Sequence, residues 1–172
     1  MVTETRLPAA VLPVSLVVLS AAAGIRGDGV GGRAVDVFAT AVFVILAWID
    51  LERRIVPNVI VLPAALVTLV GRIVVEPSQW AIYLAASLGA AAFFLIAHAI
   101  YPVGLGMGDV KLALLIGAAT GRHILVALVV GTGAAGVYSI ALLARHGAAA
   151  RKTALPFAPF LALGAIVVLI LY

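Results

Sequence analysis

The sequence predicts an all-α protein, a polytopic membrane bundle of about seven transmembrane helices. Of its 172 residues, 65% are hydrophobic and only 10% are charged, and the mean hydropathy is +1.28. The apolar residues fall in successive runs of about 17–22 residues split by short polar breaks, the length that crosses a bilayer as a helix. A water-soluble domain of this size does not need so much apolar surface. We therefore predict one membrane-embedded domain over residues 1–172.

The apolar runs place the expected helices in order. They lie near residues 7–25, 34–51, 58–75, 80–101, 109–121, 123–144 and 154–172. The first resembles a signal peptide, but its apolar stretch continues to Ile25, so we expect it to be retained as a membrane helix. The fifth would rise only about 20 Å, short of a hydrocarbon core of about 30 Å, which places its first residues beside a water-accessible recess. Small residues in GAATG (117–121) and GTGAAG (131–136) predict close helix packing.

The basic residues indicate an orientation in the membrane. The net charge is +4, but the basic residues lie in the breaks between apolar runs and form no stripe with aromatics, so we expect no nucleic-acid partner. If the N-terminus and the breaks at 52–57, 102–108 and 145–153 are cytoplasmic, basic residues are more frequent on that side. The cytoplasmic set is Arg6, Arg53, Arg54, Lys111, Arg145, Arg151 and Lys152, and the opposite set is Arg26, Arg33, Arg72 and Arg122.

Two of the seven acidic residues stand out from the rest. Glu4, Asp28 and Glu76 fall in termini or loops, and Asp36 lies near a helix end where it can reach water. Asp50 ends the apolar run AVFVILAWID, just before a charged break and Pro57, which suits the start of the next helix. Asp109 follows two spaced glycines in GLGMGDVKL, with almost nothing polar around it. Taken singly, Asp50 reads as an interfacial residue paired with Arg53 or Arg54, and Asp109 as a helix N-cap.

Asp50 and Asp109 together suggest chemistry. On different helices but at the same membrane level, two carboxyls can face each other across a recess, where one keeps its proton while the other stays anionic. Such a pair can activate a water as general base and protonate a leaving group as general acid. The alternative is a small transporter or channel that conducts protons or cations through the same carboxylates. A transporter would favour inverted repeats, and no convincing repeat relates the two halves.

Cysteine is absent, which excludes disulfides, thiolate metal sites and a cysteine nucleophile. His123 and His146 lack metal-ligand spacing, so we expect no metal and no cofactor. His98, near the end of the fourth helix, reads as a satisfied interfacial histidine close to the possible site.

Three ordered motifs resemble the type IV prepilin peptidases, polytopic aspartyl proteases of the GxGD class. They are DLERRIVPN (50–58), GMGDVKL (106–112) and KTALPFAPFLALG (152–164). The resemblance spans about residues 34–168, which leaves 1–33 as an additional N-terminal helix and loop. Presenilin-type and signal-peptide-peptidase proteases share GxGD but carry a Pro-Ala-Leu segment near the end, where this chain has LPFAPFLALG.

The resemblance implies a function and a site. Asp50 and Asp109 would be the catalytic dyad, at the cytoplasmic face of the inner (cytoplasmic) membrane, acting on prepilins or pseudopilins whose basic leader precedes a hydrophobic helix. Residues expected to bind substrate or shape the site are Gly106, Gly108, Lys111, Pro57, Asn58, Lys152, Pro156 and Pro159. Lys111 lies about 200° around a helix from Asp109, so no ion pair between them is expected.

The same resemblance bears on a second activity. Larger members carry an amino-terminal module with paired cysteines that is linked to N-methylation. Since this chain has no cysteine and no soluble segment of that size, we expect proteolysis without methylation. Besides prepilins, membrane lipid is the expected partner, and the sequence indicates neither the oligomeric state nor the particular pilin.

Overall fold

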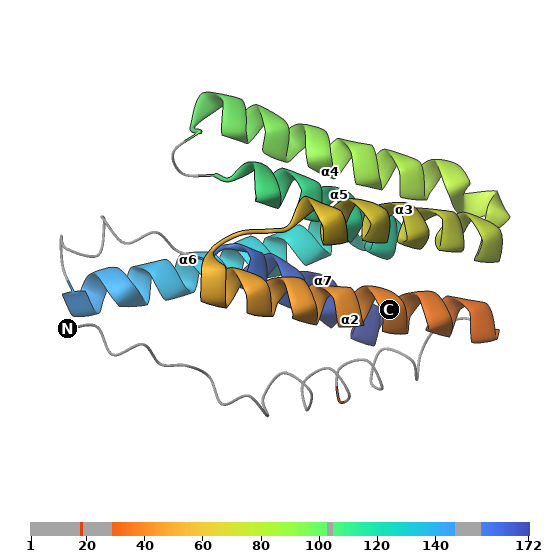
Figure 1. The fold of residues 1–172 in the computed structure, drawn as a ribbon, viewed down its shortest axis with the longest axis horizontal. Helices are drawn as coiled ribbons and strands as arrows, with labels where there is room; N and C mark the ends of the chain where they lie inside the picture. Colours follow the sequence, from red (N-terminus) through yellow and green to blue (C-terminus); the bar gives the residue numbers. More distant parts are fainter. Residues whose placement is uncertain (1–17, 19–28, 103–104, 147–155) are drawn as a thin grey trace.

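The computed structural model describes residues 18, 29–102, 105–146 and 156–172, and these residues form α-helices joined by short turns (Figure 1). The elements are α2 (Gly29–Arg53), α3 (Asn58–Val75), η1 (Pro77–Gln79), α4 (Trp80–Ile100), α5 (Met107–Thr120), η2 (Gly121–His123), α6 (Ile124–His146) and α7 (Ala158–Leu171). The predicted all-α fold is confirmed. The predicted helix at 7–25 falls almost entirely outside the described residues, so the count of seven stays a prediction.

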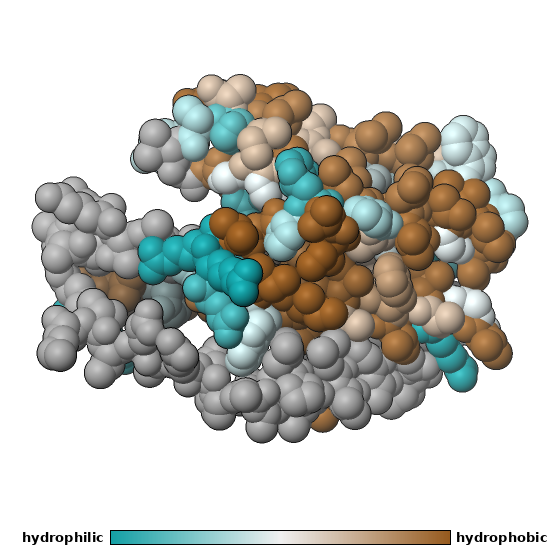
Figure 2. Space-filling model, viewed as in Figure 1, coloured by the Kyte–Doolittle hydropathy of each residue, from teal (hydrophilic) through white to brown (hydrophobic). Residues whose placement is uncertain are grey.

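The helices are apolar enough to span a bilayer. Four stretches have the length and composition of membrane spans, and α7 is a shorter apolar helix of 14 residues. The spans are Gly29–Arg53, Asn58–Val75, Pro77–Ile100 and Met107–Arg145, the last of which turns at η2. Large apolar side chains such as Leu66, Phe93 and Val129 are more than half exposed, and apolar residues cover much of the coloured surface in Figure 2. Such a surface is suited to lipid, and the chain is an integral membrane protein.

Successive helices run in opposite directions, which gives the bundle two distinct ends. One end, called here the Asp50 end, gathers the C-termini of α2 and α4 and the N-termini of α3, α5 and α7 (left and centre in Figure 1). The opposite end, the Asp36 end, gathers the N-termini of α2 and α4 and the C-termini of α3, α5 and α7. Between them lies a core of fully buried side chains that includes Phe43, Leu46, Leu112, Leu115 and Leu161.

Glycines set the closest helix contacts. A Cβ at Gly117 would lie 2.4 Å from the carbonyl oxygen of Ala86 in α4, and one at Gly164 would lie 2.1 Å from that of Ala127 in α6. The predicted close packing is therefore found at GAATG. In GTGAAG only the first glycine packs against α7, and a Cβ at Gly133 or Gly136 would meet open space.

Several helix boundaries differ from the sequence prediction; the seventh helix, for example, was predicted from 154, but α7 starts at Ala158. The predicted second helix starts at 34, but α2 starts at Gly29. Its early glycines let it approach α3: a Cβ at Gly31 would lie 2.9 Å from Val75. The predicted fifth helix starts at Asp109, but α5 starts at Met107, with Gly106 as its N-cap.

Candidate active site

Asp50 lies in the last turn of α2, and only 6% of it is exposed. Its Oδ2 accepts a hydrogen bond of 3.2 Å from the backbone N–H of Ala158, the first residue of α7. The first amides of a helix have no acceptor within the helix, and a carboxylate there also interacts favourably with the helix dipole. Pro159 follows without an N–H of its own. The PFAPF segment thus binds the first aspartate through the backbone.

The surroundings of Asp50 correct one sequence interpretation. Within the described part of the chain, Asp50 forms no ion pair with Arg53 or Arg54. Instead, the Arg54 N–H donates to the Asp50 carbonyl at 2.8 Å, and Arg54 takes a left-handed φ of 55° that ends α2. Pro57 is then the N-cap of α3, and its carbonyl accepts from Ile60 and Val61 at 3.1 and 3.0 Å. This tight turn keeps α3 beside Asp50.

Asp109 is held in a similar way, by the start of its own helix. It is the third residue of α5 rather than the N-cap. Its Oδ2 accepts from the N–H of Gly106 at 3.1 Å, and its own N–H donates to the Gly106 carbonyl at the same distance. This reciprocal pairing resembles the side-chain half of a capping box. The half-buried carboxylate is fixed at the first turn of α5.

The two motif glycines have different surroundings. A Cβ at Gly108 would lie 2.9 Å from the Cβ of Val56, in the turn between α2 and α3, so only glycine fits without displacing backbone. A Cβ at Gly106 would make ordinary contact, at 3.4 Å, with Oδ2 of Asp109. Gly108 therefore allows α5 to approach the turn that follows Asp50.

Lys111 and Asn58 join the second motif to the first. The Lys111 Nζ donates to the Asn58 Oδ1 at 2.6 Å, which links α5 to the first residue of α3. The sequence predicted that Lys111 would not pair with Asp109 but gave no partner for it, since the contact depends on α3 and α5 being neighbours.

His98 holds the segment that precedes α5. Its Nδ1 donates to the carbonyl of Leu105 at 2.6 Å. The histidine is satisfied, as expected, and its bond restrains the chain just before Gly106. The sequence did not predict this bond, because its acceptor is the backbone carbonyl of Leu105 and not a polar side chain.

The remaining predicted positions lie at the edge of this region or outside it. Pro156, partly buried, precedes α7, and Pro159 is its second residue. Lys152 lies outside the described residues. Among the described histidine, aspartate and glutamate side chains, no three lie together as metal ligands would.

Asp50 and Asp109 come from separate helices to the same end of the bundle. Gly108, the residue before Asp109, packs against Val56 in the turn that follows Asp50 and so brings the start of α5 to the end of α2. Within the described residues, each carboxylate uses one oxygen to accept one backbone N–H. The second oxygen of each is thereby left for a water or a substrate group. Two such carboxyls can share general-acid and general-base roles.

Comparison with known proteins places this chain in a family. The model of the type IV leader peptidase family matches residues 37–172, which include both aspartates and the start of α7. A curated relative, the prepilin leader peptidase/N-methyltransferase of Bacillus subtilis (strain 168), is 33% identical over 162 residues, covering 86% of this chain. The chain spans about three-fifths of that relative, with 60% of its length covered. No solved structure gives a significant match. With well over half of its length matched by the family model, the chain belongs to the type IV leader peptidase family.

Proposed function

We propose that this protein is a membrane aspartyl endopeptidase that removes the leader peptide from prepilin-like precursors. Membership of the leader peptidase family and the name of the Bacillus subtilis relative support the reaction class. The observation that carries the mechanism is the placement of Asp50 and Asp109 at the same end of the bundle, each fixed by a backbone amide. Because a carboxyl pair needs no further group to activate water, these two residues suffice for the chemistry.

The reaction follows from the pair. The ionised carboxylate takes a proton from a water as the water attacks the scissile carbonyl carbon. The protonated carboxyl donates its proton to the carbonyl oxygen, and a proton is then returned to the leaving amine as the C–N bond breaks. Water is consumed, and the two products are the leader and a mature protein with a free amino group.

The Asp50 end would face the cytoplasm. The sequence count assigned Arg72 to the opposite side, but Arg72 is 7% exposed and lies inside the bundle, so it is not a loop residue. Only Arg26, Arg33 and Arg122 then remain to oppose the seven basic residues that the sequence count assigned to the cytoplasmic side. The bias is therefore greater than the sequence count suggested, which favours this orientation in the inner membrane.

The substrate would approach as an extended segment. Irregular backbone borders the two aspartates at 54–57, at 105–106 and at 156–157. Extended peptides bind through main-chain hydrogen bonds, which such backbone can supply. The Lys111–Asn58 pair, exposed at the same end, adds a polar side-chain bridge between α3 and α5.

The test is cleavage of prepilins. The full chain is co-expressed with candidate prepilins from the same genome, and the mature N-terminus is sequenced. Cleavage by the wild type, and its loss in Asp50→Asn and Asp109→Asn at equal membrane levels, is the expected result. Glu52→Gln, which alters an exposed acid beside Asp50, is the matched control and should cleave normally. An intact leader with the wild type would instead favour the transporter.

A further inference from the structure

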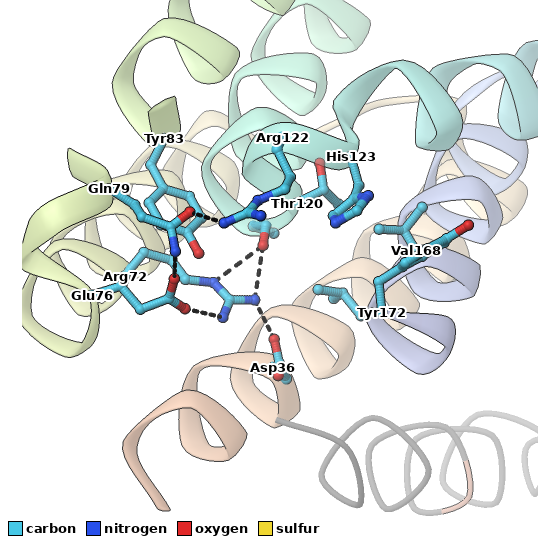
Figure 3. A pocket seen from close by; sticks show the side chains of 12 residues that line it. Asp36, Arg72, Glu76, Gln79, Tyr83, Thr120, Arg122, His123, Val168 and Tyr172 are labelled. Atoms are coloured by element: carbon cyan, nitrogen blue, oxygen red, sulfur yellow. Dashed lines mark hydrogen bonds and ion pairs between the residues drawn. The ribbon is translucent and has the colours of Figure 1, made fainter. Parts of the chain in front are cut away.

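A buried arginine joins several helices at the Asp36 end. Arg72, near the end of α3, donates to the Asp36 carboxylate of α2. Its Nε and Nη2 also donate to the Ala119 carbonyl of α5, at 3.2 and 2.8 Å (Figure 3). The guanidinium carbon lies 5.6 Å from the ring centroid of Tyr83 in α4. One side chain thus contacts α2, α4 and α5 from α3.

The contact with α5 satisfies the end of that helix. The last carbonyls of a helix have no donor within the helix, and a cation there is favourable to the helix dipole. The Gly117 carbonyl receives the N–H of Gly121, and the Ala119 carbonyl receives Arg72. Arg72 therefore acts as a cap for α5 that is supplied by another helix.

The contact with Asp36 adds α2 to this arrangement. α2 and α5 make few direct contacts, and α3 and α7 pack against both. Since α2 carries Asp50 and α5 carries Asp109, the separation of the two carboxyls depends on what bridges these helices. A buried ion pair in a membrane segment is costly and often adds little stability; fixing one packing register is its best-attested use.

We propose that Arg72, anchored by Asp36, is a positioning residue that fixes α5 relative to α2 and so sets the separation of Asp50 and Asp109. The inference rests on the proposed peptidase function. From Ala119 to Asp109 the helix rises about 15 Å, so a tilt of about 4° at the Asp36 end moves Asp109 by about 1 Å. A displacement of that size lowers a catalytic rate by about 10- to 100-fold.

A second arginine in the same place serves as the control. Arg72 and Arg122 both line a cavity of about 210 Å³ at the Asp36 end, and Arg122 is exposed. It donates to Gln79 of η1, and among the described residues no bond joins it to Asp36 or Ala119. Arg122→Ala therefore removes a cationic side chain from this cavity without removing the link between α2 and α5.

The test combines distance and kinetic measurements on the full chain, which has no cysteine of its own. Spin labels on Glu52→Cys and Met107→Cys, both at exposed positions, report the separation of α2 from α5. Labels on Ile100→Cys and Met107→Cys report α4 against α5. With Arg72→Ala we expect the 52–107 distances to shift or broaden and the 100–107 distances to stay as they are. In the unlabelled variant, kcat for leader cleavage should fall about 10- to 100-fold with little change in KM.

Arg72→Lys and Asp36→Asn keep the test decisive should Arg72→Ala fail to accumulate. Lysine keeps the charge toward Asp36 but lacks the planar pair of donors for Ala119, so an intermediate loss is expected. Arg122→Ala should leave both readouts unchanged. A lower unfolding temperature with unchanged distances and unchanged kcat per folded enzyme would overturn the proposal. If the wild type cleaves no prepilin, the function fails, but the 52–107 distances still decide the positioning role.

Discussion

The two ends of the bundle both bury charged side chains, but they use them differently. At the Asp36 end the charged groups bond mainly to one another and to a helix terminus: Arg72 to Asp36 and Ala119, and Gln79 to Glu76 at 2.6 Å. At the Asp50 end the two aspartates are each held by one backbone N–H. Among the described residues, most hydrogen-bonding groups of these side chains are paired at the Asp36 end, whereas at the Asp50 end each carboxylate keeps one oxygen for water or substrate. A closed polar cluster specifies packing, whereas an open carboxylate pair can bind and activate water.

The two ends also differ in what their neighbouring residues do. The glycines and prolines of the Asp50 end shape backbone: Pro57 caps α3, Gly108 admits a close approach, and Pro159 follows the amide that holds Asp50. At the Asp36 end, by contrast, the long polar side chains of Arg72 and Arg122 reach across to other elements. Substitutions should therefore act through backbone placement at the first end and through lost side-chain bridges at the second.

The largest effect is expected for the carboxyl pair itself. If Asp50 and Asp109 act as one unit, Asp50→Asn and Asp109→Asn should each lower the cleavage rate by at least about 10³-fold, and the double variant should be little worse than either. Single-turnover cleavage by purified variants measures this. If each variant instead loses only about tenfold, and the two losses multiply in the double variant, the aspartates do not act as one catalytic unit. The contrast between the two ends would then fail.

Much of this architecture was accessible from the sequence. The apolar runs predicted the described helices, and alternation of direction placed Asp50 and Asp109 at the same end. Helix spacing also predicted that Lys111 would not pair with Asp109. These features depend on local pattern, or on counting how many times the chain crosses the membrane.

The contacts between helices could not be predicted from the sequence. Asp36 was expected to reach water and Arg72 was counted with the basic residues of the non-cytoplasmic side, yet 4% and 7% of these residues are exposed and they pair with each other. Glu76 was expected to be solvated, but it is partly buried and accepts from Gln79. Such pairings depend on the register between helices. Arg72 is 36 residues from Asp36 in the sequence and 47 residues from Ala119. A single sequence contains no direct signal for either.

The next effect distinguishes the two glycines of the Asp50 end. Gly108→Ala should lower cleavage by about 10- to 100-fold, because its Cβ would displace α5 from the turn at Val56. Gly106→Ala should change it by less than about threefold, since φ is −76° and the Cβ would fit. Val56→Gly should restore part of the activity of Gly108→Ala by removing the clashing atoms. Equal losses at both glycines, or no rescue, would contradict a role in backbone placement.

The smallest effect concerns two threonines between the ends. Thr40 of α2 and Thr68 of α3 are fully buried, and their hydroxyls have no hydrogen-bond partner among the residues that the structure describes. They lie one helical turn toward the middle of the bundle from Asp36 and Arg72, on antiparallel helices. An unpaired buried hydroxyl costs about 1–3 kcal/mol, and valine has nearly the same shape. Thr40→Val and Thr68→Val should therefore raise the free energy of unfolding by about 1 kcal/mol and leave cleavage unchanged.

A third threonine supplies the comparison for this measurement. Thr120, also buried, donates to the Ile116 carbonyl at 2.8 Å, so Thr120→Val should lower the free energy of unfolding by about 1 kcal/mol. Unfolding in mixed micelles measures all three variants. If Thr40→Val destabilises the protein as much as Thr120→Val does, the hydroxyl is bonded after all, for example to a buried water. The closed polar region of the Asp36 end would then extend at least one turn deeper, toward the middle of the bundle and the helices that carry Asp50 and Asp109.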